Sequence, residues 1–300
     1  MDLLRAWIRA EALEALLIRA LPGPDIDSPP TRPLSPALPS AFALRMRTDG
    51  TGDLFSQRVG SPAAALALGL TPETLLRQAM GRTTAPARGR DPGGFPTDLG
   101  RGLLAPVSLP GLLLEVMAGM ALSLRMRGGD RVALLVDDTA GSGSGDWHEG
   151  LNFAAVQGVP LVVVMDDTRR NATDAAVEGM VERAGAYGFG VHPAPGSDPD
   201  AIRSATRDAV DAARAGHGLQ VVDVRTGHGD PLATMVARAR ETAGLDDEAL
   251  VTLRRAADEE MNQALDTVRA EPAAAPDAVL PTPMPTPPGL PRVRTPRPWS

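Results

Sequence analysis

Two pairs of aspartates follow strand-like segments and are the residues of this chain best suited to do chemistry. Asp137 and Asp138 come directly after an apolar run, and Asp166 and Asp167 directly after the next one. If the two strands are parallel neighbours, the four carboxylates meet at the carboxyl edge of the sheet, where open α/β sheets bind ligands. Carboxylates next to hydroxyl groups suit a hard divalent cation such as Mg²⁺.

A glycine-rich loop lies between the two pairs. Residues 139–145, TAGSGSG, include Gly141 and lead into a helix that we expect to begin near Asp146. Such a turn at a helix N-terminus presents free backbone N–H groups to an anion. A metal with a phosphate is therefore the natural ligand chemistry for this pattern. The plainer alternative is an ordinary turn with Asp146 as the helix cap. The loop lacks the G-x-G-x-x-G spacing of a dinucleotide site.

Short segments rich in β-branched residues must position these carboxylates. We expect strands at 132–136, 160–165 and 219–224. The alternation of such segments with helices predicts an α/β fold with a doubly wound, mostly parallel sheet flanked by helices. We expect helices at 2–20, 112–128, 147–157, 174–187, 199–215 and 246–270, and two within 62–80, the second starting at Thr71.

Composition removes several classes of chemistry. The 300 residues contain no Cys and no Lys, so disulfides, thiolate catalysis, a lysine Schiff base and a Walker-type phosphate lysine are excluded. The net charge of -7 argues against a general nucleic-acid binder. No apolar run reaches the ~20 residues that a transmembrane helix needs, and the first 20 residues read as an amphipathic helix. We expect a cytoplasmic protein.

Proline content divides the chain. We expect an N-terminal helix and extended arm over 1–40, a main domain over 41–270 and a tail over 271–300. Because the tail holds ten prolines, it should form an extended arm that contacts a larger complex or stays disordered.

The passage GDWHEGLNFAAVQGVPLVVVMDD, residues 145–167, resembles a known family. It is similar to the α subunits of thiamine-diphosphate-dependent 2-oxo acid dehydrogenase E1 components, of the pyruvate and branched-chain type. That family shows a GDG motif, then a GD-aromatic-HEALNFAA helix, then a strand that ends in NN. The resemblance continues in the same order over most of residues 5–272, so it implies the thiamine-diphosphate-binding fold.

The resemblance also implies a metal site. In the family, the Asp of GDG and the second Asn of NN hold the Mg²⁺ that clamps the diphosphate of the cofactor. Reading DDT as GDG and the second aspartate pair as NN assigns the metal to Asp138 and Asp167. A gap-free alignment on GDWHE instead places Thr139 and Thr168 at the ligand positions, and both registers remain open. The first is preferred because it places carboxylates where a cation needs them.

Three further residues take family positions. Arg58 stands in place of the diphosphate-binding arginine, and Gly141 lies in the cofactor loop. His228 stands in place of a loop histidine near the reacting carbon, and is therefore the catalytic candidate. This sequence departs from the family pattern in two places. Both glycines of GDG are absent, and a loop histidine of the family has no counterpart here.

The resemblance implies an α chain that binds thiamine diphosphate and Mg²⁺ for oxidative decarboxylation of a 2-oxo acid with acyl transfer to lipoyl. It also implies an E1β-type partner in an α2β2 heterotetramer. The alternative is a catalytically degenerate E1α-like protein that serves as a structural or assembly subunit of a larger complex. A magnesium-dependent phosphate-handling enzyme of another type is a third, weaker hypothesis.

Overall fold

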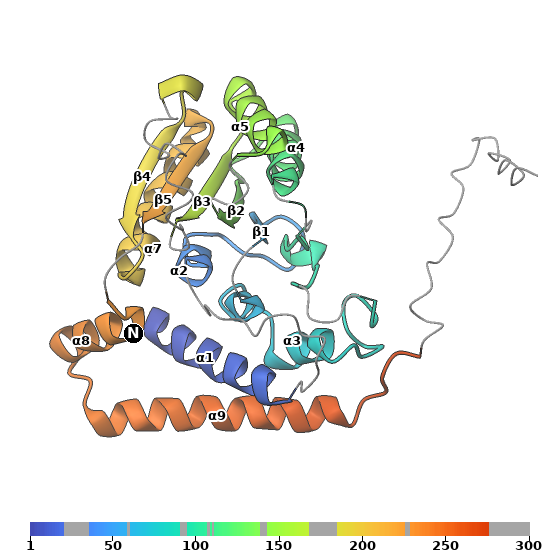
Figure 1. The fold of residues 1–300 in the computed structure, drawn as a ribbon, viewed down its shortest axis with the longest axis vertical. Helices are drawn as coiled ribbons and strands as arrows, with labels where there is room; N and C mark the ends of the chain where they lie inside the picture. Colours follow the sequence, from blue (N-terminus) through green and yellow to red (C-terminus); the bar gives the residue numbers. More distant parts are fainter. Residues whose placement is uncertain are drawn as a thin grey trace, which may run out of the picture.

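A parallel sheet forms the centre of the molecule (Figure 1). The computed structural model describes residues 1–20, 36–58, 61–90, 95–106, 109, 111–138, 143–167, 185–225 and 229–275. Within these residues the sheet has five strands in the order β1-β2-β3-β5-β4, and every neighbouring pair is parallel. The strands are Leu54–Gln57 (β1), Ala133–Asp138 (β2), Leu161–Asp167 (β3), Gly190–Pro195 (β4) and Gln220–Arg225 (β5).

The predicted doubly wound parallel sheet is confirmed, and its three predicted strands are β2, β3 and β5. The two strands that the sequence did not predict lie at the edges of the sheet. β1 is only four residues long and half polar, and β4 contains Pro193 and Pro195. Proline in a sheet is confined to edges and bulges because it donates no ladder hydrogen bond, so neither segment looks like a buried strand.

Helices cover both faces of the sheet and the space beyond its strand ends. They are Asp2–Ala20 (α1), Ala37–Ala41 (α2), Pro72–Ala79 (α3), Leu112–Arg127 (α4), Gly145–Gln157 (α5), Pro199–Ala212 (α7), Pro231–Ala243 (α8) and Asp247–Arg269 (α9). In Figure 1 the strand arrowheads point towards the layer that contains α1, α8 and α9. The helix predicted at 174–187 falls mostly outside the described residues. None of the described helices is long and apolar enough to cross a bilayer.

Helix caps set two of these boundaries. Thr71 caps α3 by accepting a hydrogen bond from the backbone N–H of Thr74, and Pro72 follows it, as predicted. α5 is capped by Ser144, whose Oγ accepts from the backbone N–H of Trp147 at 3.2 Å. The cap role suggested for Asp146 is therefore wrong, since Asp146 lies in the first turn of α5. The first helix expected within 62–80 is a short 3-10 helix, Pro62–Leu66.

The two helices on one face of the sheet pack closely because a glycine lies between them. A Cβ atom added to Gly150 of α5 would lie 3.0 Å from the backbone N of Glu115 and 3.0 Å from Cγ of Leu114, both on α4. Trp147 and Leu151 of α5 share an apolar cluster with the inner side of α4 and with alternate residues of β2 and β3. The glycine therefore fixes the distance between α4 and α5.

Replacing Gly150 with Val should lower the free energy of unfolding by about 1–3 kcal/mol, because the branched side chain forces the two helices apart. Gly119→Ala is the matched control, since a Cβ atom there meets nothing within 4 Å. That variant should be neutral or more stable by up to ~1 kcal/mol. Urea unfolding of the three proteins measures both, and equal stabilities for Gly150→Val and the parent chain would contradict this packing.

The buried carboxyl of Glu14 braces α1 against the segment that follows β1. Its side chain is 3% exposed, and burial raises its pKa to about 8 although a hydrogen bond with Ser61 opposes the shift. Gln57 joins the same group by donating from Nε2 to the backbone carbonyl of Ser61 at 2.9 Å. Within the described residues, Oε1 of Glu14 and Oε1 of Gln57 are buried without a hydrogen-bond partner. A protonated Glu14 is the form that this environment favours.

The raised pKa of Glu14 predicts a stability that falls as pH rises from about 5 to about 8. Over that interval the folded state keeps a proton that the unfolded state has released, so rising pH favours unfolding, by at most about 1.4 kcal/mol per pH unit. Glu14→Gln does not titrate, so its stability relative to the parent chain should increase between pH 5 and pH 8. Glu259→Gln, at an exposed position on α9, should keep a constant difference. A flat difference for Glu14→Gln in urea titrations would show that Glu14 is ionised in the fold.

Candidate functional site

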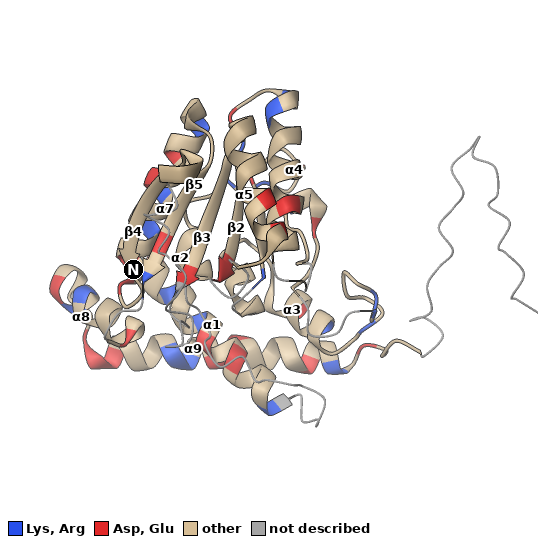
Figure 2. Ribbon diagram, turned by 45° about the horizontal axis from the view of Figure 1, so that its top comes forward, with Lys and Arg blue, Asp and Glu red and all other residues tan. Residues whose placement is uncertain are grey.

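The carboxyl ends of β1, β2 and β3 bring distant segments of the chain together. The register pairs Gln57 with Val136 and Asp138 with Asp166. Arg58 continues the ladder past the end of β1, because its backbone N–H donates to the carbonyl of Val136 at 2.9 Å. Figure 2 shows acidic residues at the arrowheads of β2 and β3. One arginine and the ends of two acidic strands therefore share this edge.

The side chain of Arg58 bridges the first aspartate pair. Its Nε donates to Oδ1 of Asp137 and its Nη2 donates to Oδ1 of Asp138. The side chains of Arg58, Asp137 and Asp138 are 12%, 0% and 10% exposed. Oδ1 of Asp137 also accepts from the backbone N–H of Asp138 at 2.8 Å. Charge-assisted hydrogen bonds of this kind are among the strongest in proteins, so the three residues form one unit.

Asp137 keeps an oxygen that the described residues do not engage. Its Oδ2 is buried and has no hydrogen-bond partner. Burial raises the pKa of Asp137, while the charge and hydrogen bond of Arg58 oppose that shift. A buried carboxyl oxygen without a hydrogen-bond partner carries an uncompensated desolvation cost, which a bound ligand or ion would relieve.

A buried aspartate at the amino ends of the strands provides a comparison, because both of its carboxylate oxygens accept hydrogen bonds. Asp53 accepts from the backbone N–H of Val132 and from Arg214 Nη1 at Oδ1, at 3.0 and 3.2 Å. Its Oδ2 accepts from the backbone N–H of Arg45 and from Arg214 Nη2, at 2.7 and 2.9 Å. Both oxygens of Asp53 are engaged, whereas Asp137 has one that is not. The open oxygen therefore distinguishes the carboxyl edge as a candidate site.

Further charges line the same edge. Asp166 is 2% exposed at the end of β3, and Asp223 of β5 accepts from Arg225 Nε at 2.8 Å. Carboxylate oxygens are the ligands that Mg²⁺ prefers. No group of three or more acidic or histidine residues in the described part of the chain is arranged to hold a metal ion. The donor types thus fit a hard cation, while Arg58 bridges the first pair in this arrangement.

Comparison with known proteins assigns the chain to a family. The model of the dehydrogenase E1 component family matches residues 61–229, more than half of the chain. The chain belongs to the dehydrogenase E1 component family. The 2-oxoisovalerate dehydrogenase subunit alpha of Bacillus subtilis is 28% identical over 246 residues, which cover 72% of this chain and 74% of that protein. The pyruvate dehydrogenase E1 component subunit alpha of Staphylococcus aureus is 32% identical over 128 residues, which cover 41% of this chain and 35% of that one.

Solved structures show the same fold at low sequence identity. Transketolase from Campylobacter jejuni superposes with a TM-score of 0.54 at 16% identity, over 90% of this chain and 49% of the transketolase chain. Transketolase from Pichia stipitis gives a TM-score of 0.52 at 18% identity, over 89% and 44% of the two chains. This E1 family member spans about half the length of the transketolases that it matches. It has the thiamine-diphosphate-binding fold predicted from the resemblance.

The predicted site residues of this E1 family member fall into two groups. Arg58 and Asp138 lie together at the carboxyl edge, and they contact each other. The backbone of Asp167 ends β3, while its side chain, Gly141 and His228 lie outside the described residues. The alternative metal positions, Thr139 and Thr168, also lie outside, so the choice of register stays a prediction.

The role of Asp137 was missed at the sequence level. The resemblance assigned a partner only to the second member of the pair, and the buried ion pair with Arg58 depends on the register of β1 against β2. The doublet itself gave no such signal, because successive strand residues point to opposite faces of a sheet and one arginine is not expected to contact both.

His148 of α5 has a packing contact rather than a metal partner among the described residues. Its Nδ1 lies 2.7 Å from the hydroxyl of Tyr187, and the Tyr187 ring stacks on Phe189 with centroids 6.2 Å apart. This contact ties α5 to the chain just before β4.

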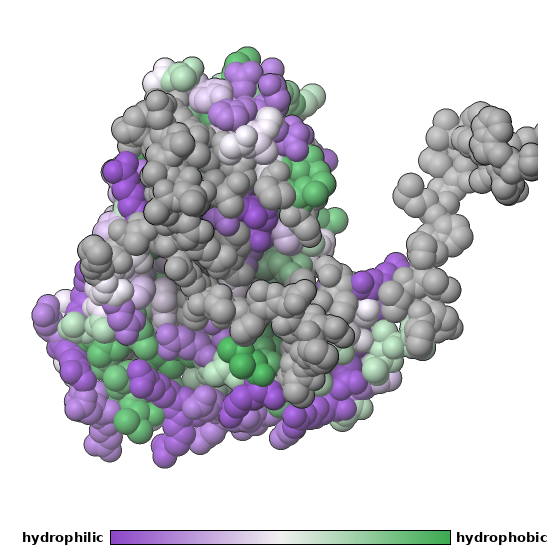
Figure 3. Space-filling model, in the orientation of Figure 1, coloured by the Kyte–Doolittle hydropathy of each residue, from purple (hydrophilic) through white to green (hydrophobic). Residues whose placement is uncertain are grey.

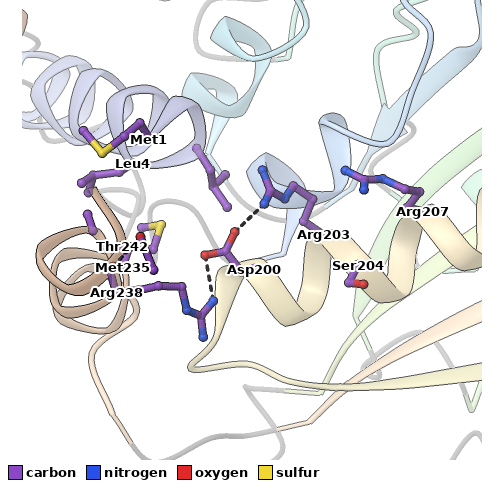
Figure 4. A pocket seen from close by; sticks show the side chains of 11 residues that line it. Met1, Leu4, Asp200, Arg203, Ser204, Arg207, Met235, Arg238 and Thr242 are labelled. Carbon is purple, nitrogen blue, oxygen red and sulfur yellow. Dashed lines mark hydrogen bonds and ion pairs between the residues drawn. The ribbon is translucent and has the colours of Figure 1, made fainter. Parts of the chain in front are cut away.

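Away from the strand ends, a hollow of about 450 Å³ lies between α1, α7 and α8 (Figure 4). Asp200 accepts there from Arg238 at 2.8 Å and pairs with Arg203 at 2.7 Å. Arg238 also binds Asp198, the N-cap of α7, and its hydrogen bond holds the pKa of Asp198 below the ordinary range. These charges already compensate one another and join α8 to α7, so the hollow is secondary to the strand-end site.

The bridge at the site predicts a distinctive double-mutant cycle. Arg58→Gln should lower the free energy of unfolding by about 3–5 kcal/mol, because it leaves a buried carboxylate uncompensated. Adding Asp137→Asn removes that charge, so the double variant should be more stable than Arg58→Gln alone. Arg255→Gln, at an exposed ion pair on α9, should change stability by less than about 1 kcal/mol. Denaturant unfolding measures the cycle, and additive effects of the two site substitutions would rule out the bridge.

Proposed function

We propose that this chain is the α subunit of a 2-oxo acid dehydrogenase, and that it binds thiamine diphosphate and Mg²⁺ at the carboxyl edge of its sheet. The observation that carries the proposal is the meeting of Arg58 with Asp137 and Asp138 at that edge in a member of the E1 family. Basic and acidic residues side by side suit a ligand that consists of an anionic diphosphate and a divalent cation.

Each predicted residue has a role in this proposal. Asp138 and Asp167 hold the metal, Arg58 engages diphosphate oxygens, and the loop containing Gly141 supplies backbone N–H groups. His228 would act near the reacting carbon of the substrate, as the resemblance implies. The cofactor, when bound, supplies a carbon centre that stabilises the carbanion left by decarboxylation. In a complete assembly the acyl group would be transferred to a lipoyl carrier.

A second chain of E1β type is part of the proposal, in an α2β2 assembly. The outer surfaces of α4 and α5 expose Val116, Phe153 and Val156, at 39%, 41% and 75%. Figure 3 shows hydrophobic surface beside α4. Exposed apolar side chains gathered on two adjacent helices are typical of an interaction surface. A partner that covers α4 and α5 removes this surface from water.

The degenerate subunit remains the second candidate, and a specific observation favours it. Arg58 already pairs with both Asp137 and Asp138 within the fold, so each carboxylate has a cationic partner without a metal. A protein kept only for assembly would retain such a bridge. The proline-rich tail over 271–300, mostly outside the described residues, would then serve as its contact with a larger complex.

Calorimetric titration with thiamine diphosphate in the presence of Mg²⁺ separates the two candidates. We expect binding by the full chain, alone or with an E1β-type chain, at a Kd of roughly 1–100 µM. Asp138→Ala should weaken it by about tenfold or more, since the metal loses a ligand. Asp130→Asn, an exposed acid ahead of β2, should bind as the parent chain does. Absence of binding in both settings would reject the enzyme subunit and leave the assembly role.

A further inference from the structure

The position of Arg58 raises a question that family membership does not answer. Its guanidinium contacts Oδ1 of both Asp137 and Asp138, so one cation already bridges the carboxylates nearest to the proposed metal position. The three side chains are almost wholly excluded from water. Charges in such surroundings are screened far less than at the surface. A divalent cation on the same oxygens would therefore meet strong repulsion from Arg58.

Arg58 has an alternative partner if a phosphate group reaches the edge. Guanidinium groups bind phosphate through two parallel N–H donors, in the same manner as they bind carboxylate. When Arg58 turns to a phosphate, Asp137 loses the counter-ion that the structure shows and requires a replacement. The buried Oδ2 of Asp137, which has no partner among the described residues, is an acceptor that such a replacement could use.

We propose that Arg58 is a built-in counter-ion, which keeps the Asp137–Asp138 pair closed to divalent cations until a phosphate-bearing ligand engages its guanidinium. The proposal rests on the proposed function of this edge and adds an order to it. The metal and the phosphate then bind as a coupled pair, because each makes room for the other. Linkage requires the coupling to be the same in both directions.

The direct test measures Mn²⁺ binding by electron paramagnetic resonance on the full chain, with and without inorganic pyrophosphate at a fixed concentration of free Mn²⁺. The parent chain should bind Mn²⁺ at least about tenfold more tightly when pyrophosphate is present. Arg58→Gln should bind Mn²⁺ about tenfold more tightly than the parent chain in the absence of pyrophosphate, and pyrophosphate should then add less than about threefold. Equal affinities of the parent chain and Arg58→Gln for Mn²⁺ alone would overturn the proposal.

Two further variants keep the result interpretable. Arg58→Lys retains the charge but cannot bridge both carboxylates with one planar group, so it should fold and show an intermediate affinity for Mn²⁺ alone. If Arg58→Gln does not fold by circular dichroism, Arg58→Lys decides the matter, and parental affinity in that variant counts against the proposal. Arg225→Gln removes a paired arginine from the same edge and should behave as the parent chain does.

The Mn²⁺ measurements and the calorimetric titration with thiamine diphosphate together separate this proposal from the proposed function. A parent chain that never binds thiamine diphosphate, while Arg58→Gln gains Mn²⁺ affinity, refutes the enzyme subunit and supports the counter-ion. A parent chain that binds the cofactor, while the Arg58 variants show no gain for Mn²⁺, supports the enzyme subunit and refutes the counter-ion.

Discussion

The buried bridge from Arg58 to Asp137 and Asp138 is the interaction on which the carboxyl edge of this sheet depends. Two adjacent carboxylates with almost no exposure to water are tolerated only with a cation between them. The bridge requires β1 to pair with β2 in one register, since Arg58 follows β1 directly. The short, partly polar β1 is thus held against β2 by the ion pairs of Arg58 as well as by backbone hydrogen bonds.

The surrounding elements support that geometry from two sides. On one side, α1 buries Glu14 against Ser61, and Gln57 bonds the same residue, so the segment around Arg58 is fixed to the N-terminal helix. On the other side, α5 follows the glycine-rich loop after β2, and Gly150 lets α4 approach it closely. These small and buried polar residues therefore position the carboxyl edge of the sheet as well as pack the core.

The fold was predictable from the sequence where burial dominates. The interior strands β2, β3 and β5 are apolar enough to be predicted from periodicity, and the passage 145–167 indicated the family that the comparison over residues 61–229 shows. The edge strands were not predictable, because their pattern is set by one-sided pairing and by Pro193 and Pro195. The bridge was not predictable either. Which carboxylate an arginine meets is decided by strand register, and the resemblance alone pointed Arg58 at a phosphate.

Two states of one arginine connect the structure with its proposed use. In the structure Arg58 contacts Asp137 and Asp138, and in the proposed second state it engages a phosphate while a divalent cation replaces it. Crystal structures of the full chain without ligand, and with Mg²⁺ and thiamine diphosphate, compare these states most directly. The account predicts a guanidinium between the two aspartates in the first and on diphosphate oxygens in the second, with the metal on Asp138. An Arg58 that stays on both aspartates while metal and cofactor are bound would contradict it.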